Sequence, residues 1–346
     1  MYGAIIGDIA GSSYERHATK DKDFEWFREG SRFTDDTVMT VAVAETLLGL
    51  LASNGTYSSS WRSLGDWSDV DTSGNSLTDS AVFASMTKGL RKWGRRYPEA
   101  GYGRRFHEWF MSQHSKPYHS FGNGSAMRVS PVGWLFDDMF TTRRIARLTA
   151  AVSHDHQEGI KGAEAVAAAI FLAREEADKR TFEKQVIKEY IQKEFGYDLE
   201  RTLDEIRPDY AFDVSCQGSV PEAIIAFLES EDYESAVRNA VSLGGDSDTQ
   251  GAIAGSIAEA FYGVPTAFID QVRGYGAAEV GGVECKPMIS DDIAQVIDKF
   301  YYALPGIQEG YSMLKKCDSQ DAIAVVLLWT RIHIAARYLR GDSTMI

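Results

Sequence analysis

Two acidic motifs, each directly ahead of an apolar helical stretch, carry residue types that suit divalent-metal chemistry. They are Phe33-Thr34-Asp35-Asp36-Thr37 and Gly244-Gly245-Asp246-Ser247-Asp248-Thr249. Carboxylate and hydroxyl oxygens are hard ligands, so these residues suit Mg²⁺, Mn²⁺ or Ca²⁺ better than zinc. Each motif alone also has a structural explanation, because such residues cap helices and their charge suits the positive end of the helix dipole.

Together the two motifs predict a dinuclear metal centre. Asp35, Asp36, Asp246 and Asp248 carry four negative charges when ionised, and two divalent cations would neutralise them. In a shared pocket without metal, mutual repulsion would raise some of their pKa values and destabilise the fold. The glycines at 244–245 permit an extended approach, in which residues two apart lie on the same side of the chain. We therefore expect two segments about 200 positions apart to enclose one pair of cations.

Three further segments have polar residues in patterns that suit ligand binding. Glu15 follows a glycine-rich stretch and could reach into a pocket, although a lone loop glutamate is more often only solvated. Backbone N–H groups at Gly122-Asn123-Gly124-Ser125 could cradle phosphate groups with the glycines at positive φ, and an ordinary tight turn explains the same residues. The segment Ser153-His154-Asp155-His156 lacks a third zinc ligand, which favours hydrogen bonding to a ligand or helix capping.

Helical periodicity dominates the chain and clean period-two alternation is rare, which predicts an all-α fold. We expect one helix from the first acidic motif to Gly49, one over residues 163–176 that ends in a charged run, and one over residues 249–262. Glycines recur every fourth position at 3, 7 and 11 and again at 251 and 255. Because glycine costs a helix interior about 1 kcal/mol, this spacing predicts a close approach of two backbones.

Composition limits the classes of function. The chain has 346 residues and a net charge of −14, with no basic stripe apart from a short helix end at residues 91–96, so we expect no nucleic-acid duplex as partner. Three separated cysteines fit a reducing cytoplasm. Residues 1–8 lack the basic start of a signal peptide, and the apolar run at residues 322–329 is too short to span a bilayer. We therefore expect a cytoplasmic protein that does not associate with a membrane.

The domain organisation that we expect is one catalytic domain over residues 1–304 with a helical extension over residues 305–346. Residues 54–80 are rich in Ser, Gly, Asp and Asn, which predicts a long surface loop or a locally ordered insertion. The last helix, at residues 321–340, has an apolar stripe that would pack on the body of the protein or on a second subunit, so an oligomer is possible through it.

Five motifs in order resemble the ADP-ribosylglycohydrolase family over about residues 1–265: GAIIGDIAGSSYE, FTDDT, GNGSAMR, SHDH and GGDSDT. The resemblance implies a compact orthogonal multi-helix bundle with two cations, Mg²⁺ or Mn²⁺, at the base of an ADP-ribose cleft. Its implied metal ligands are Thr34, Asp35, Asp36, Asp246, Asp248 and Thr249. Its implied ligand-binding residues are Gly122, Asn123, Gly124, Ser125 and Met127, beside the pyrophosphate and distal ribose, and His154. Glu15 matches the glutamate of a flexible loop near the scissile ribose, and the unusual sequence of residues 9–15 leaves the acceptor in doubt.

The function that we expect from this resemblance is hydrolysis of the N- or O-glycosidic bond at C1″ of ADP-ribose. The metals would bind the ribose 2″ and 3″ hydroxyls, and Glu15 or Asp36 would handle the proton in an oxocarbenium-like transition state. The substrate would be an ADP-ribosylated protein or small molecule and the product ADP-ribose, with arginine, serine, a base or an O-acyl group all open as acceptor. A metal-dependent phosphohydrolase and a catalytically silent ADP-ribose-binding or structural protein are the alternatives. The presence of every motif ligand and of Glu15 counts against the catalytically silent protein.

Overall fold

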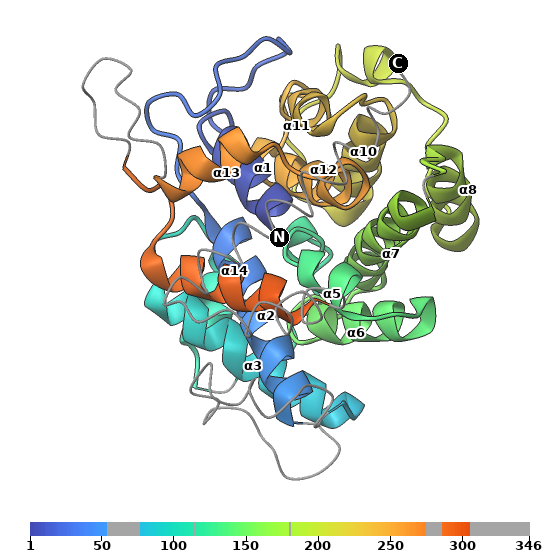
Figure 1. The fold of residues 1–346 in the computed structure, drawn as a ribbon. Coiled ribbons are helices and arrows are strands. Elements are labelled where there is room, and N and C mark those ends of the chain that lie inside the picture. The colour runs from blue at the N-terminus through green and yellow to red at the C-terminus, as the bar shows by residue number, and fades with distance from the viewer. Residues whose placement is uncertain (54–76, 114, 180, 275–285, 305–346) are drawn as a thin grey trace, which may run out of the picture.

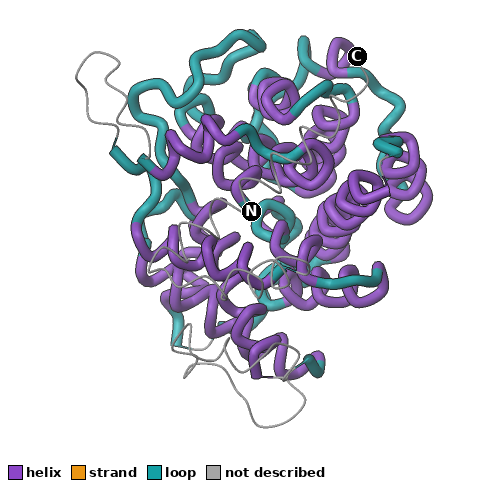
Figure 2. The backbone as a smooth tube through the Cα atoms, in the orientation of Figure 1, coloured by secondary structure: helices purple, strands orange, loops and turns teal. Residues whose placement is uncertain are grey.

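The computed structural model describes residues 1–53, 77–113, 115–179, 181–274 and 286–304. These residues form fourteen α-helices, one 3-10 helix and no strand, which confirms the all-α prediction (Figures 1 and 2). The helices are α1 (Tyr2–Ser12), α2 (Asp35–Ser53), α3 (Asp79–Arg96), α4 (Arg104–Met111), η2 (Asn123–Ser125), α5 (Ser130–Leu135), α6 (Met139–Ala151), α7 (Gln157–Lys179), α8 (Lys184–Phe195), α9 (Leu203–Ile206), α10 (Cys216–Leu228), α11 (Tyr233–Val241), α12 (Ser247–Tyr262), α13 (Thr266–Arg273) and α14 (Asp291–Ala303).

The central contact of the fold is the antiparallel packing of α1 against α12, which lie side by side in Figure 1. Gly3 faces Gly255, Gly7 faces Gly251, and Gly11 faces the backbone of Ser247, so that a Cβ atom on any of the three would overlap a carbonyl oxygen of α12. The predicted close approach is confirmed. Because the helices are antiparallel, the end of α1 that leads to Glu15 lies beside the beginning of α12.

Helix α2 runs through the core and is longer than the sequence predicted. Gly49 does not end it: the helix continues to Ser53 because Leu50, Leu51 and Ala52 are buried. Burying a leucine side chain contributes roughly 1.5–3 kcal/mol, which exceeds the cost of one internal glycine of about 1 kcal/mol. By length and composition α2 could cross a membrane, but 89% of its apolar window is buried in the molecule. The core therefore accounts for its apolar residues.

Helix α7 also extends past its predicted end. The charged run at residues 174–176 is not a solvated end, because Arg174 is buried and donates hydrogen bonds to the carbonyl oxygens of Trp134 (2.5 Å) and Phe136 (2.8 Å). Glu176 is buried as well and accepts a hydrogen bond from the Thr181 hydroxyl. The helix consequently continues to Lys179, while α12 has the bounds predicted for it to within two residues.

Two segments interpreted from the sequence lie largely outside the described residues. Of the loop expected over residues 54–80, the described part shows that it ends early, because the Thr78 side chain caps α3 and the helix begins at Asp79. Residues 305–346, including the helix expected at 321–340, are not described. The basic stretch at residues 91–96 does form the end of α3, as predicted.

Candidate metal and ligand site

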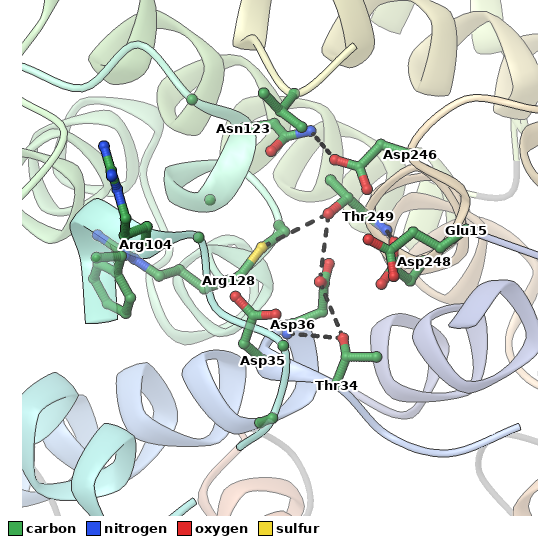
Figure 3. A pocket seen from close by; sticks show the side chains of 18 of the residues that line it. Glu15, Thr34, Asp35, Asp36, Arg104, Asn123, Arg128, Asp246, Asp248 and Thr249 are labelled. Carbon is green, nitrogen blue, oxygen red and sulfur yellow. Dashed lines mark hydrogen bonds between the residues drawn. The ribbon is translucent and has the colours of Figure 1, made fainter. Parts of the chain in front are cut away.

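A cavity of about 480 Å³ collects the residues that the sequence singled out. Both acidic motifs, Glu15, the loop at residues 122–124, Met127 and His154 line it (Figure 3). Three helix ends meet there, namely the C-terminal end of α1 and the N-terminal ends of α2 and α12. The site is therefore built by segments far apart in sequence that the α1–α12 contact brings together.

The two acidic motifs contact each other directly. The Thr249 hydroxyl lies 3.3 Å from Asp36 Oδ2, as Figure 3 shows, across 213 positions of the chain. Asp246 has a non-helical backbone (φ −75°, ψ 78°), whereas Asp248 lies in the first turn of α12. This change of conformation turns two carboxylates that would diverge on a regular helix toward one pocket.

Two groups of three carboxylates have oxygen atoms within 4.8 Å of one another. One group is Asp8, Asp36 and Asp248, and the other is Glu15, Asp246 and Asp248. Because Asp248 belongs to both, the two groups are adjacent and share one carboxylate. Among the described residues, the buried Oδ1 atom of Asp36 has no hydrogen-bond partner. An acceptor oxygen left without a donor in a buried acidic cluster suits a cation, since burying it unpaired is otherwise costly.

Asp8 belongs to this cluster, although the sequence analysis assigned it no role. Its fully buried carboxylate accepts hydrogen bonds from the hydroxyl of Thr34 (2.7 Å) and the hydroxyl of Thr37 (2.5 Å). It also accepts from the backbone N–H groups of both threonines, at 2.9 and 3.1 Å. Burial raises the pKa of Asp8 to about 6 in spite of these donors. The signal in the sequence was an ionisable residue inside a helix of otherwise small and apolar residues.

The other carboxylates also have raised pKa values. Burial, followed by the charges of Asp8 and other aspartates of the site, raises the pKa of Asp35 and Asp36 well above the usual range. Burial and the charges of Asp246 and Asp36 do the same to Asp248. Among the described residues, none of these aspartates has an ion pair with a lysine or arginine, and Arg128, which lines the cavity, donates instead to the carbonyl oxygen of Thr149 (2.9 Å). The residues present therefore fit a site for divalent cations.

Asn123 connects the glycine-flanked loop to the second acidic motif. Its side-chain amide donates to Asp246 Oδ2 (2.7 Å) and to Ser219 Oγ (3.1 Å). Burial raises the pKa of Asp246, and the hydrogen bonds that it has with Asp248 and Asn123 oppose this rise. The loop is held by an antiparallel bridge between Gly122 and Ser215, with hydrogen bonds on either side of it. Asn123 is therefore placed to position a carboxylate of the cluster.

The glycines of this loop are needed because a larger residue would have too little room, and not because the backbone has a positive φ. Neither Gly122 nor Gly124 has a positive φ, so this part of the sequence interpretation was wrong. A Cβ atom on Gly124 would lie 3.2 Å from Nε2 of His154, which is tighter than most real contacts. Ser125 points away from the pocket and donates to the carbonyl oxygen of Gly159 (2.7 Å), whereas Met127 lines the pocket with its sulfur 3.8 Å from the Thr249 hydroxyl.

The two histidines of the SHDH segment have different surroundings. His154 is buried in the pocket wall, with Nδ1 2.8 Å from the hydroxyl of Ser153. Burial and the nearby charge of Arg128 hold its pKa well below the usual range, so the imidazole is neutral. His156 instead accepts from the backbone N–H of Glu158 (3.1 Å) at the beginning of α7. One histidine is thus available to a ligand and the other caps a helix.

Glu15 reaches the pocket from a segment that is tied to both sides of the site. Its side chain is partly exposed and lines the cavity beside Asp246 and Asp248. On one side, Arg28 donates to the hydroxyl of Ser13 (3.0 Å) and stacks on Tyr14. Farther along, Lys20 donates to the carbonyl oxygens of Tyr210 and Leu243, each at 2.6 Å. These contacts hold the Glu15 segment against the second acidic motif.

Comparison with known proteins places this geometry in a family. The family model of the ADP-ribosylglycohydrolases matches residues 1–304. The ADP-ribosylhydrolase ARH3 of Homo sapiens is 25% identical over 81% of this chain and 90% of its own length, and that of Gallus gallus is 26% identical over 76% and 84%. A solved structure described as an ADP-ribosylglycohydrolase-related protein complex shares the fold, with a TM-score of 0.53, 21% identity, and coverage of 88% of this chain and 97% of the other. The chain thus belongs to the ADP-ribosylglycohydrolase family.

Proposed function

We propose that this protein is a metal-dependent hydrolase that cleaves the N- or O-glycosidic bond at C1″ of ADP-ribose. The observation that carries the proposal is the pair of adjacent carboxylate groups sharing Asp248 at the base of a cavity of about 480 Å³. A cavity of that size is in the range that binds small organic ligands. The relatives named ADP-ribosylhydrolase support the same reaction, with an ADP-ribosylated protein or small molecule as substrate and ADP-ribose as product.

In this proposal two cations, Mg²⁺ or Mn²⁺, are held by the oxygen ligands of both acidic motifs. These ligands are Thr34, Asp35 and Asp36 from the first motif and Asp246, Asp248 and Thr249 from the second. When bound, the cations supply positive charge that neutralises the carboxylates, orients the ribose hydroxyls and makes water more acidic. Asp8 accepts a hydrogen bond from the hydroxyl of Thr34, and the Asp36 backbone N–H donates to the same hydroxyl oxygen, which leaves that oxygen one lone pair for a cation.

Glu15 is the residue that we propose for proton transfer. Its carboxylate stands at the edge of the cluster and is partly exposed, so it can be reached both by water and by the leaving atom of the acceptor. Asp36 is the second candidate, but it is buried deeper, with 2% of its surface exposed. A retaining double displacement needs another carboxylate without a metal-binding role, and the acids of this cavity are already committed to the cluster.

Neutral His154 and the loop at residues 122–124 provide the polar groups of the cavity wall. A neutral imidazole can donate or accept one hydrogen bond, so His154 can bind a ligand hydroxyl or phosphate oxygen without adding charge. Residues 122–124 and Met127 border the same space, and the backbone N–H groups of Gly122 and Asn123 already donate to the hydroxyl of Ser120 (3.2 Å) and the carbonyl oxygen of Val214 (2.8 Å). We propose that this wall contacts the pyrophosphate and distal ribose, while the cluster contacts the proximal ribose.

Product analysis tests the proposal against a phosphohydrolase, which would use the same carboxylates on a phosphoryl oxygen. The protein is incubated with Mg²⁺ or Mn²⁺ and a panel of acceptors ADP-ribosylated on arginine, serine, a base or an O-acyl group, and with simple phosphate esters. We expect free ADP-ribose from at least one acceptor, with its pyrophosphate intact. Release of inorganic phosphate or of AMP in place of ADP-ribose contradicts the proposal, and turnover of none of the substrates indicates a silent binding protein.

A further inference from the structure

We propose that an arginine pair beside Glu15, formed by Arg16 and Arg32, binds an anionic group of the acceptor. The substrate class that this selects is an ADP-ribosylated protein segment with acidic residues next to the modified side chain. The inference rests on the proposed function, because it assigns the acceptor of that same site. The reasons are where the two arginines lie, the absence of partners for them among the described residues, and the charge of the rest of the molecule.

Arg16 and Arg32 lie on two segments that are tied together next to Glu15. The backbone N–H of Arg32 donates to the hydroxyl of Ser12 (3.1 Å), and the hydroxyl of Ser31 lies 3.2 Å from that of Ser13. Both arginine side chains are exposed and line the cavity that contains Glu15. The pair is therefore held at one end of the site by the backbone around it.

Within the part of the chain that the structure describes, the guanidinium groups of the pair have no hydrogen bond or ion pair. Many other arginines of the described residues do have carboxylate partners, for example Arg144 with Asp79 (2.5 Å) and Arg238 with Glu234 (2.7 Å). Arg28, close by, is also occupied, since it binds Ser13 and stacks on Tyr14. Arg104, which lies across the acidic cluster from Glu15 in Figure 3, likewise has no side-chain partner among the described residues, so Arg16 and Arg32 are distinguished by their place beside Glu15. In a chain with 50 acidic and 36 basic residues, guanidinium groups without a partner in the described part of the chain suit an external anion.

The position of the pair distinguishes the acceptor from the ADP portion of the substrate. In Figure 3, Glu15 and Arg104 lie on opposite sides of the acidic cluster, and Asn123 and Arg128 lie away from Glu15. The loop at residues 122–124 that we propose for the pyrophosphate meets the cluster at Asp246, through Asn123, whereas Arg16 directly follows Glu15 in the chain. With the proximal ribose on the cluster, the bond to be cleaved faces Glu15, and the acceptor extends toward the arginine pair.

An acidic peptide fits these charges better than a nucleic acid. A net charge of −14 repels an extended polyanion, whereas one or two carboxylates can approach the pair locally, within a Debye length of about 8 Å at physiological ionic strength. Carboxylates also match the planar guanidinium group, which binds them through two parallel hydrogen bonds. The pair therefore selects acidic residues close in sequence to the modified one.

The test compares two synthetic peptides that carry ADP-ribose on the same side chain, through whichever linkage the acceptor panel shows to be cleaved. One peptide has Glu and Asp next to the modified residue, and the other has Gln and Asn at the same positions. We expect kcat/KM to be roughly three- to tenfold higher for the acidic peptide, because an exposed ion pair contributes about two- to fivefold. The preference should disappear in 0.5 M NaCl, where exposed charges are screened.

The variants Arg16→Gln and Arg32→Gln should each lower the acidic-to-neutral ratio of kcat/KM by roughly two- to fivefold. The matched control is Lys193→Gln, which changes the net charge equally at an exposed position of α8 outside the cavity and should leave the ratio unchanged. Binding of both peptides to Glu15→Gln protein, measured by fluorescence anisotropy, gives a second readout that does not need turnover. Equal kcat/KM for both peptides overturns the inference alone, while cleavage of neither overturns the proposed function and this inference with it.

Discussion

Asn123 donates a hydrogen bond of 2.7 Å to Oδ2 of Asp246 and thereby ties the loop before α5 to the acidic motif before α12. Asn123 is buried and its amide has Ser219 Oγ as its other acceptor, so the amide orientation is fixed. A fixed donor behind a ligand carboxylate determines which oxygen faces the metal and how basic it is. The same residue that the sequence suggested for ligand binding consequently supports the proposed metal site.

Replacing Asn123 should weaken metal binding. Asn123→Ala removes the donor, leaves Asp246 buried without it and raises the pKa of Asp246 further, so we expect Mg²⁺ or Mn²⁺ affinity to fall about 10- to 100-fold. Isothermal titration calorimetry measures the change. Ser219→Ala is the control, because it removes the neighbouring acceptor and keeps the bond to Asp246. An unchanged affinity in Asn123→Ala contradicts a supporting role.

Divalent metal should stabilise the folded protein. A ligand that binds only the folded state at 100 times its Kd adds about 2.7 kcal/mol to the free energy of unfolding, so millimolar Mg²⁺ or Mn²⁺ should raise the Tm. Asp248→Ala should remove most of this rise because Asp248 belongs to both carboxylate groups. Asp204→Asn, at a side chain that is 93% exposed, should keep it. The same Tm with and without metal in the wild type argues against the dinuclear centre.

The stability of the metal-free protein should depend on pH in a defined direction. Burial and neighbouring charges raise the pKa of Asp248 and of Asp36 in the folded state, and Asp8 titrates near 6. A carboxyl group with a raised folded pKa contributes stability that is complete below the unfolded value near 4 and is lost as the pH rises through the folded value. In EDTA, the contribution of these groups to the Tm should therefore fall from pH 5 to pH 8.

The measurement for this pH effect is the difference between wild type and Asp248→Asn. Such a difference is needed because His154, with a lowered pKa, contributes stability that changes in the opposite direction. We expect the variant to gain Tm over the wild type in EDTA as the pH rises, since one buried negative charge is absent. A constant difference between pH 5 and pH 8 shows that Asp248 does not titrate in that window.

Glu15 should matter for turnover more than for binding. Glu15→Gln keeps the size and polarity of the side chain but cannot exchange a proton, so turnover should fall about 10²- to 10⁴-fold, the range of general acid–base catalysis. Binding of ADP-ribose, measured by calorimetry, should be largely retained because the loop at residues 122–124 and His154 are unchanged. Turnover at the wild-type rate excludes Glu15 from proton transfer.

Adding a side chain at a glycine of the α1–α12 contact should destabilise the folded protein. In an isolated helix Gly7→Ala would be favourable by about 1 kcal/mol, but here the Cβ atom overlaps the backbone of Gly251, and overpacking costs roughly 1–3 kcal/mol or more. Urea denaturation should show this loss. Gly89→Ala is a comparison in which the Cβ meets a side chain in place of the backbone, namely the hydroxyl of Thr46, which can move only by giving up its hydrogen bond to the carbonyl oxygen of Ala42 (2.7 Å). Equal stability of Gly7→Ala and wild type contradicts the close packing.

The local features of this protein were readable from its sequence. Periodicity identified α12, glycines four apart predicted a close approach of backbones, and both acidic motifs were found directly before helices. These features depend on residues within one or two helical turns of each other, so the chain specifies them without knowledge of the rest. These motifs predicted that Asp36 and Asp248 share a pocket. The geometry of that pocket could be known only from the folded structure.

Only the tertiary structure decided which partners these residues have. Asp8 lies in the site because α1 packs against the beginning of α12. Asn123 contacts Asp246 because the loop before α5 is bridged to Ser215. Gly49 failed to end α2 because the leucines that follow it are buried, although propensity alone favoured a stop there. In each case the deciding energy is desolvation or a hydrogen bond between segments far apart in sequence, which no local pattern encodes.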